Sequence, residues 1–256
     1  MKKAPIFTIG LALLVTASAW AQRSSRTPYY VIDRTGNYVY GSAIQADPTG
    51  KISIKLSGSG TRSFSSGQYR SAHAPAPQAM KDATGFMRQG NWDAALGKLD
   101  GAWRTHKYLG SAGSIARLRS TCFIKKGQAA EADKALSEGL RFEKDPDGKT
   151  KLNAARAEVQ IAQGNLAAAE ATLTRIRGGL ADPETATFVF NTRGMLLNKK
   201  GQKREAILQY LKTVLLYPKA GHVRRDALMQ VVAIMKELKD NRASQFASVL
   251  KNDYGN

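Results

Sequence analysis

Two different hydrophobic patterns divide the chain. Between residues 22 and 75, short segments such as 30–32, 38–40 and 52–56 carry their apolar side chains with a period of two. This pattern is typical of strands that bury one face. Gly, Asn, Asp and Pro residues separate the segments and favour tight turns. The stretch therefore predicts a small β unit of three to four antiparallel strands, either a meander or an SH3-like barrel.

From residue 76 to residue 256 the pattern is helical and repeats itself. Glycines recur at a spacing of 37 residues, and an alanine follows each of them after five residues. A small residue also stands seven positions before each glycine, at 83, 120, 157 and 194. The positions that define the repeat are Gly90, Ala95, Gly127, Ala132, Gly164, Ala169, Gly201 and Ala206. A fixed period of this length is the signature of a repeat architecture and not of an ordinary helical bundle.

Each repeat predicts a hairpin of two helices. A glycine can adopt the left-handed conformation that ends the first helix, and an Asn or Gln after it can cap the freed backbone groups. The small residues allow the two helices to approach closely, while larger apolar residues pack against the next hairpin. Pro146, Pro183 and Pro218 stand where the second helices are expected to end.

These residues resemble the tetratricopeptide repeat (TPR) family. The match is best at Gln89-Gly90-Asn91-Trp92 with Ala95, and in the fourth unit at Gly194, Gly201, Ala206, Tyr210 and Pro218. The period of 37 residues is longer than is usual in the family, and Gln160 occupies a position that is normally apolar. The resemblance implies a mainly α fold, a TPR-like solenoid over residues 76–256. It also implies a non-enzymatic scaffold that binds a partner along the first helices of the hairpins.

Two further segments complete the expected organisation. The residues Ala74-Pro75-Ala76-Pro77 predict a stiff, extended linker, so we expect weak coupling between the β unit and the helices. Residues 226–238 and 241–250 predict a fifth, atypical hairpin that caps the solenoid.

The expected binding surface lies on the inner face of the first helices. Residues at positions i, i+4, i+7 and i+8 of these helices predict a groove with basic, amide and thioether side chains. The groove candidates are Arg117, Thr121, Lys125, Asn191, Met195, Asn198 and Lys199. The alternative interpretation is that the lysines are solvated helix ends near the negative ends of the helix dipoles.

Charge points to an anionic partner. The chain has 39 Lys and Arg residues against 20 Asp and Glu, a net charge of +19. An acidic protein or peptide fits this balance. The alternative function is charge-driven binding of a polyanion, either extracellular nucleic acid, acidic polysaccharide or anionic lipid. Tyr29, Tyr38, Tyr40 and Tyr69 are the aromatic residues that could support nucleic-acid binding, and they could equally form the core of the β unit.

Catalytic and metal-binding motifs do not stand out. Cys122 is the only cysteine, so no intramolecular disulfide can form, and its apolar neighbours predict a buried thiol. The three histidines are scattered and no metal-ligand spacing is present. Residues 145–148, Asp-Pro-Asp-Gly, predict a turn between hairpins and not a calcium loop. We therefore expect neither a cofactor nor enzymatic activity.

The N-terminus predicts a secretory signal peptide over residues 1–21. Lys2 and Lys3 precede a short apolar run, and Ala19-Trp20-Ala21 supplies the small residues that signal peptidase requires. The apolar run is shorter than the roughly 20 residues of a membrane-spanning helix. This order of features predicts a periplasmic or secreted protein.

We predict that the mature protein begins at residue 22, because cleavage after Ala21 follows from the small residues before it. Intact-mass measurement on protein from the native cell envelope or culture medium tests this. A mass that includes residues 1–21 contradicts the prediction.

Overall fold

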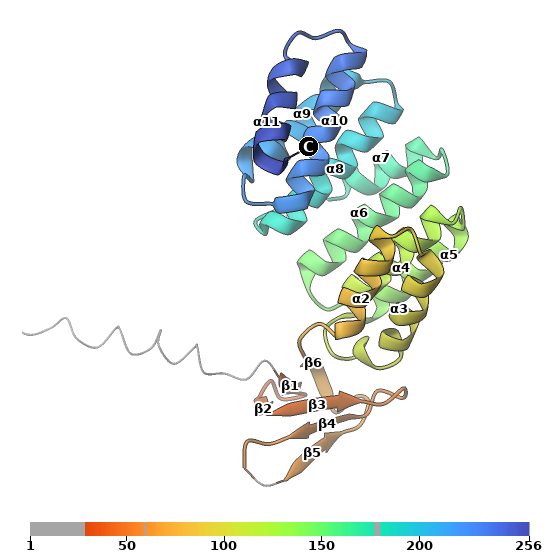
Figure 1. Ribbon diagram of the computed structural model, residues 1–256. Coiled ribbons are helices and arrows are strands. Elements are labelled where there is room, and N and C mark those ends of the chain that lie inside the picture. The colour runs from red at the N-terminus through yellow and green to blue at the C-terminus, as the bar shows by residue number, and fades with distance from the viewer. Residues whose placement is uncertain (1–28, 59, 177–179, 256) are drawn as a thin grey trace, which may run out of the picture.

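The computed structural model describes residues 29–58, 60–176 and 180–255. The predicted signal peptide lies outside these residues. The described chain begins with six short strands and continues with ten helices (Figure 1). The strands are β1 (Tyr29–Asp33), β2 (Tyr38–Gly41), β3 (Ala43–Ala46), β4 (Ile52–Lys55), β5 (Thr61–Phe64) and β6 (Tyr69–His73).

The strands form two antiparallel sheets, with the orders β2-β1-β6 and β3-β4-β5. This gives six strands where the sequence predicts three to four. The two additional strands are β3 and β6. Strand β3 follows β2 after Ser42, so that one nearly continuous segment serves both sheets, and β6 pairs with β1. A Cβ atom on Gly41 would lie 2.3 Å from the Lys55 carbonyl oxygen, so glycine allows the segment to bend against β4. The structure thus confirms a small antiparallel β unit and divides it into two three-stranded sheets.

The two sheets enclose a small core, and the helical part contributes to it. Val31, Ile52 and Ile54 are fully buried between the sheets. Leu109, which follows helix α3 (Trp92–His106), is buried in the same cluster. The Ala74 backbone N–H donates to the Leu109 carbonyl oxygen at 3.1 Å. These contacts anchor the β unit to the helices. They indicate tighter coupling than the Ala-Pro linker predicts.

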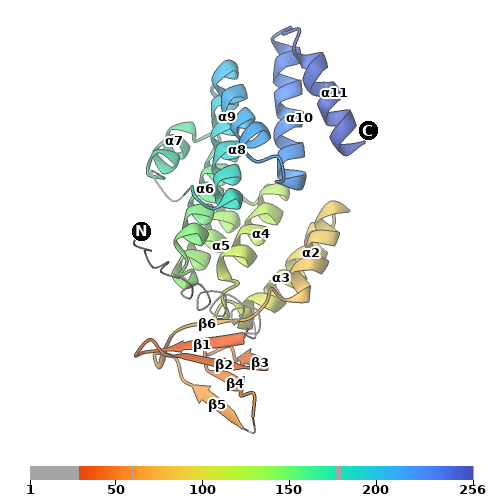
Figure 2. The same ribbon diagram turned by 90° about the vertical axis from the view of Figure 1, so that its left-hand side faces the viewer.

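The helices form five consecutive hairpins. The first helices are α2 (Gln78–Arg88), α4 (Ala112–Lys125), α6 (Pro146–Ala162), α8 (Pro183–Lys199) and α10 (Gly221–Glu237). The second helices are α3 (Trp92–His106), α5 (Ala129–Phe142), α7 (Leu166–Thr174), α9 (Lys203–Leu216) and α11 (Ala243–Tyr254). Figure 2 shows the hairpins following one another away from the β unit. The mainly α fold and the repeated hairpins that the sequence predicts are confirmed.

The glycines of the repeat end the first helices. Gly90, Gly127, Gly164 and Gly201 have φ angles between 73° and 78°, in the left-handed region. At Gly201 the backbone N–H donates to Asn198, and the next N–H donates to Leu197. These two bonds are those of a Schellman motif, which satisfies the last carbonyl groups of the helix.

The small residues lie where the two helices of a hairpin meet. Ala95, Ala132, Ala169 and Ala206 are all completely buried. In the fourth hairpin, a Cβ atom on Gly194 would lie 2.8 Å from the Tyr210 ring. Position 194 therefore requires glycine, because the Tyr210 ring of the second helix occupies the space that a side chain would need.

Two details of the hairpins differ from the expectation. The side chains of Asn91 and Asn165 accept a backbone N–H and cap their helices. The longer side chains of Gln128 and Gln202 form no such hydrogen bond. Pro146 and Pro183 begin the next first helix instead of only ending the previous one. The Asp residue before each proline caps the helix, as shown by the bond from the Gly148 N–H to Asp145 at 2.7 Å.

The fifth hairpin begins earlier than the sequence predicts, at Gly221, and it departs from the repeat at its turn. Lys239 replaces the glycine and has a φ angle of 54°. Its N–H donates to Lys236 and the following N–H donates to Met235, which is the same pattern as at Gly201. A lysine thus adopts a conformation that favours glycine.

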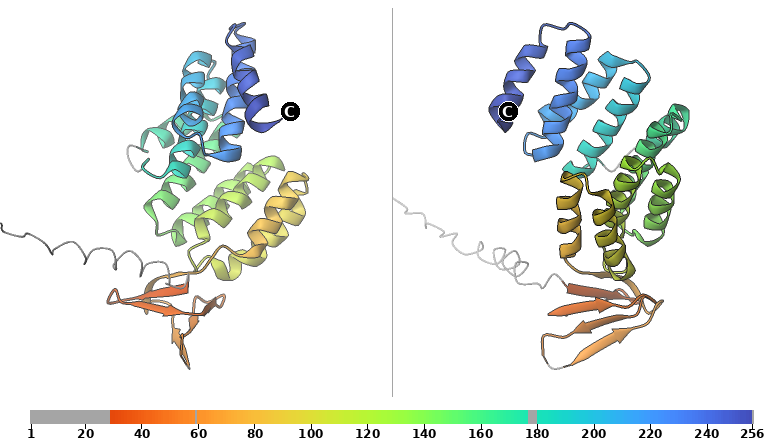
Figure 3. Two further views of the ribbon diagram at one scale, coloured as in Figure 1. Left: turned by 60° about the vertical axis from the view of Figure 1, so that its left-hand side comes forward. Right: turned by 45° about the vertical axis from the view of Figure 1, so that its right-hand side comes forward.

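The first helices form one continuous layer. Helix α4 contacts α6, α6 contacts α8, and α8 contacts α10. The second helices pack against the outside of this layer. Each second helix has its most extensive contact with the first helix of its own hairpin. Both views in Figure 3 show the hairpins side by side above the β unit. The layer of first helices is the surface on which a ligand can contact several hairpins at once.

We predict that Lys239→Gly stabilises the protein by about 0.5–1 kcal/mol, because it removes the cost of a left-handed lysine. The free energy of unfolding from urea titration measures the effect. Lys236→Gly is the control: it lies in α10 with helical geometry, so the same change should lower the free energy of unfolding. Equal destabilisation by both substitutions contradicts the prediction.

Candidate functional site

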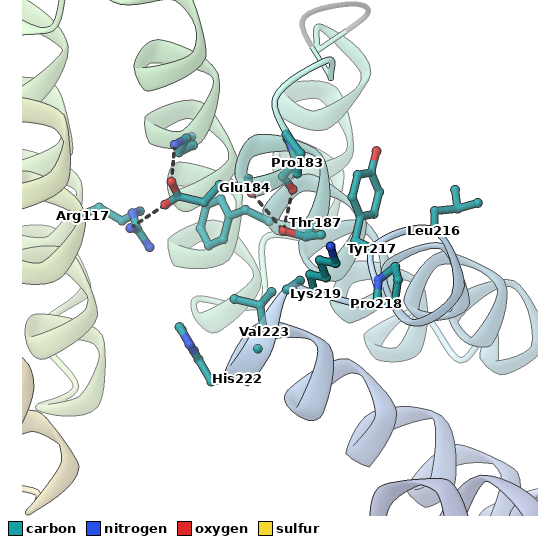
Figure 4. A pocket seen from close by; sticks show the side chains of 14 residues that line it. Arg117, Pro183, Glu184, Thr187, Leu216, Tyr217, Pro218, Lys219, His222 and Val223 are labelled. Atoms are coloured by element: carbon teal, nitrogen blue, oxygen red, sulfur yellow. Dashed lines mark hydrogen bonds and ion pairs between the residues drawn. The ribbon is translucent and has the colours of Figure 1, made fainter. Parts of the chain in front are cut away.

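A pocket of about 680 Å³ opens on the layer of first helices. It is lined by residues of α4, α6, α8 and α10 and by the loop between α9 and α10. Figure 4 shows side chains from these elements around one space, with Val223 and His222 of α10 facing Glu184 and Thr187 of α8. A volume of this size accommodates a bulky side chain and its neighbours.

The walls of the pocket are largely apolar. Phe188 lines the pocket from α8, where it is half-buried, and Val223 lines it from α10. Leu216, Tyr217 and Pro218 contribute from the α9–α10 loop region, where the Leu216 side chain is 64% exposed. An exposed apolar wall within a concave surface is characteristic of a site that another molecule covers.

Charged residues stand around the apolar walls. The cations Arg117, Lys151 and Lys219 line the pocket together with His222, and Glu184 is the acidic residue that lines it. Glu184 lies between two of these cations, 2.9 Å from the Lys151 Nζ and 3.7 Å from the Arg117 guanidinium. Arg117 also lies over the Phe188 ring at 5.3 Å. Asp182 also lies 3.6 Å from the Lys151 Nζ, so two carboxylates face the three cations Arg117, Lys151 and Lys219. The remaining positive charge favours an acidic group at this edge.

The seven predicted groove residues do not share one site in the structure. Arg117 lines the pocket. The Thr121 hydroxyl donates to the Arg117 carbonyl within α4, and Asn191 uses its amide inside the fold, accepting from Thr213 at 2.8 Å and donating to Val223. Lys125, Met195 and Lys199 are exposed and Asn198 is half-buried, all in the C-terminal halves of α4 and α8 and away from the pocket. Of the predicted set, Arg117 alone lines this pocket.

The remaining pocket residues were missed by the sequence reasoning. Lys151 and Phe188 are separated by 37 residues and occupy the same position in successive repeats. Extending the predicted face by one helical turn toward the N-termini would have found both. The loop residues Tyr217 and Lys219 follow no periodicity, so no pattern in the sequence could place them.

The carboxyl group of Glu158, near Arg117, has a raised pKa. Burial raises the pKa of Glu158 on α6 to about 7, and this exceeds the opposite effects of the Thr192 hydroxyl and Arg117. The Thr192 Oγ1 donates to the Glu158 Oε1 at 3.1 Å. Burial, with Glu158 nearby, also raises the pKa of Tyr210 to about 12. The centre of the first-helix layer is therefore a place where negative charge is costly.

Other candidate chemistry is structural. Cys122 is completely buried, and burial raises the pKa of its thiol to about 11, which keeps it protonated and unreactive. Within residues 29–58, 60–176 and 180–255, no group of three potential ligands from His, Cys, Asp and Glu is placed to hold a metal. No helix in this part of the chain is long and apolar enough to span a membrane.

No family model and no curated protein matches the chain. PilF of Pseudomonas aeruginosa is 15% identical, with 70% of this chain and 75% of that chain covered and a TM-score of 0.49. MamA of Desulfovibrio magneticus RS-1 is 12% identical over 68% and 92%, with a TM-score of 0.42. YrrB, described as a TPR protein with an unusual peptide-binding site, is 17% identical over 68% and 84%, with a TM-score of 0.37.

The helical array is TPR-like. This follows from its repeated hairpins, left-handed glycines and buried alanines, and the three similarities concern the fold alone. The TPR-like architecture that the sequence predicts is thus confirmed.

We predict that Glu158→Gln stabilises the protein at pH 8 by on the order of 1 kcal/mol and has little effect at pH 4. A raised pKa means that the folded state holds a proton that the unfolded state has lost, so wild-type stability falls as the pH rises from about 4.5 to about 7. Glutamine carries no charge and keeps an acceptor for Thr192. Urea titrations of both proteins across this range measure the difference. Destabilisation at pH 8 contradicts the prediction and shows that Arg117 stabilises the carboxylate more than burial penalises it.

Proposed function

We propose that this protein is an exported, non-enzymatic scaffold that binds a partner protein through a segment docked on its first helices. The pocket between α4, α6, α8 and α10 carries this proposal, because four consecutive hairpins contribute to one concave space. TPR-like solenoids bury a ligand in this way on their inner surface.

The chemistry of the pocket specifies the bound segment. Phe188 and Val223 favour a bulky apolar side chain as the anchor. Lys151, Arg117 and Lys219 favour Asp or Glu next to this anchor, in agreement with the net charge of +19. We therefore propose an acidic protein or peptide partner with an apolar residue in an extended or helical segment.

Export forms part of the same proposal. Its support is the order of basic, apolar and small residues in positions 1–21. A protein with this leader meets its partner in the periplasm or outside the cell. These compartments are oxidising, and burial shields the single thiol of Cys122 from oxidation there.

We predict that Val223→Arg lowers the affinity for such a segment by about tenfold or more, because it places a long charged side chain in the apolar pocket. The measurement begins with selection of random twelve-residue peptides on the full chain. We expect the selected peptides to combine an aromatic or aliphatic residue with Asp or Glu, and fluorescence anisotropy then gives the affinity of each variant.

Met229→Arg is the matched control. Met229 lies on the same helix, is 44% exposed and does not line the pocket, and its replacement makes the same change in charge. We expect its affinity to stay within about twofold of the wild type. Selected peptides without acidic residues, or equal losses in the two variants, refute the proposed mode of binding.

A further inference from the structure

A second cleft, of about 650 Å³, lies between the β unit and the helices. One wall is the outer face of sheet β2-β1-β6, with Tyr30 and His73. The other wall comes from the α3–α4 loop and the α5–α6 loop, with Tyr108 and Phe142. The first pocket lies among the helices, so the two sites have different surroundings even though Arg117 and Lys151 border both.

Aromatic rings form a row along the sheet wall. Strand pairing places Tyr30 between Tyr40 and His73, and alternation puts Tyr38 on the same face. The Tyr30 ring centroid lies 5.1 Å from that of His73 and 5.5 Å from that of Tyr38. His73 is exposed and Tyr38 is 54% exposed. The row therefore leads from the cleft onto the open face of the sheet. Tyr38 and Tyr40 lie outside the core of the β unit, whereas Tyr29 and Tyr69 pack against that core.

Three of the cations that line the cleft have no acidic partner among the described residues. Among the described residues, Lys107, Arg141 and Lys144 form no ion pair with a carboxylate. The Lys107 ammonium is held over the rings of Trp103, Tyr108 and Phe142 at 5.0 to 5.8 Å from their centroids.

The carboxylates that line the cleft are occupied by the backbone. Glu143 accepts from the N–H groups of Gly113 and Asp145, and Asp145 accepts from the N–H of Gly148. Each carboxylate stabilises a helix start or the loop before it. Both carboxylates keep their charge, but six Lys and Arg residues line the same cleft, so positive charge predominates there and attracts an anionic ligand.

We propose that this cleft and the aromatic row beside it bind single-stranded nucleic acid. Phosphates would contact Lys107, Arg141 and Lys144, while unpaired bases would stack on Tyr38 and the rings next to it. Cations that follow the backbone together with rings that stack on bases are the two components of sequence-tolerant single-strand binding. An acidic peptide would use the cations but not the row of rings, and a duplex keeps its bases stacked inside the helix.

The test measures anisotropy of a labelled fifteen-nucleotide oligo-dT with the full chain. The comparison probe is an abasic oligonucleotide of the same length, which has the same phosphates but no bases. We expect oligo-dT to bind about tenfold or more tightly than the abasic probe, and more tightly than a duplex, heparin or poly-glutamate.

Substitutions separate stacking from charge. Tyr38→Ala should weaken oligo-dT binding about fivefold or more and leave the abasic probe unaffected, whereas Tyr38→Trp should retain binding. The Arg141→Ala/Lys144→Ala variant should weaken both probes and reduce the slope of log affinity against log salt by about 1.4. The Lys98→Ala/Lys134→Ala variant loses the same charge from exposed positions on α3 and α5 and should keep the wild-type slope.

Three outcomes overturn the proposal. Equal affinity for oligo-dT and the abasic probe, or for oligo-dT and heparin, shows that charge alone holds the ligand. An unchanged affinity in Tyr38→Ala shows that the rings do not stack on bases. Equal changes of slope in the two double variants show that the positive charge acts from the whole surface and not from this cleft.

Discussion

The close approach of two helices within each hairpin is the constraint on which the structure depends. Completely buried alanines at 95, 132, 169 and 206 leave no room for a larger side chain, and Gly194 faces the Tyr210 ring directly. The left-handed glycine between the helices sets the angle at which they meet. Because the same contact recurs every 37 residues, the first helices align in one layer, and only such a layer can present several hairpins to one ligand.

The β unit is positioned by a second contact, which the helical repeat does not contain. Leu109 leaves the helical array after α3 and enters the core of the two sheets, and the Tyr108 hydroxyl donates to the Pro48 carbonyl at 3.1 Å. Gly50, with a φ angle of 88°, lies directly against the Tyr108 ring. These contacts fix the outer face of sheet β2-β1-β6 beside the helices. The cleft with Tyr30 and His73 therefore exists because the loop between the first and second hairpins completes the core of the β unit.

The sequence predicts the repeated elements well and the sites poorly, for a physical reason. Helix starts, left-handed glycines and buried alanines depend on neighbours within one repeat, so a pattern of 37 residues reveals them. Arg117 was found because it belongs to that pattern. Asn191 belongs to it as well, but its amide bonds to Thr213 and Val223, contacts that arise only when α9 and α10 pack beside it. Tyr217 in a loop and Leu109 in the β core likewise acquire their roles from the tertiary structure.

The same dependence on packing explains how the large positive charge is distributed. Many cations of the helices are neutralised between neighbouring elements, as Arg156 is by Asp133 and Lys200 by Glu170. Glu184 does the same for Arg117 and Lys151, but these two cations also border both cavities. An anionic group that reaches them from either side must compete with Glu184 for the same two charges. The two cavities therefore share one ion-pair cluster, and the packing of α4, α6 and α8 that forms this cluster sets the charge at the border of both.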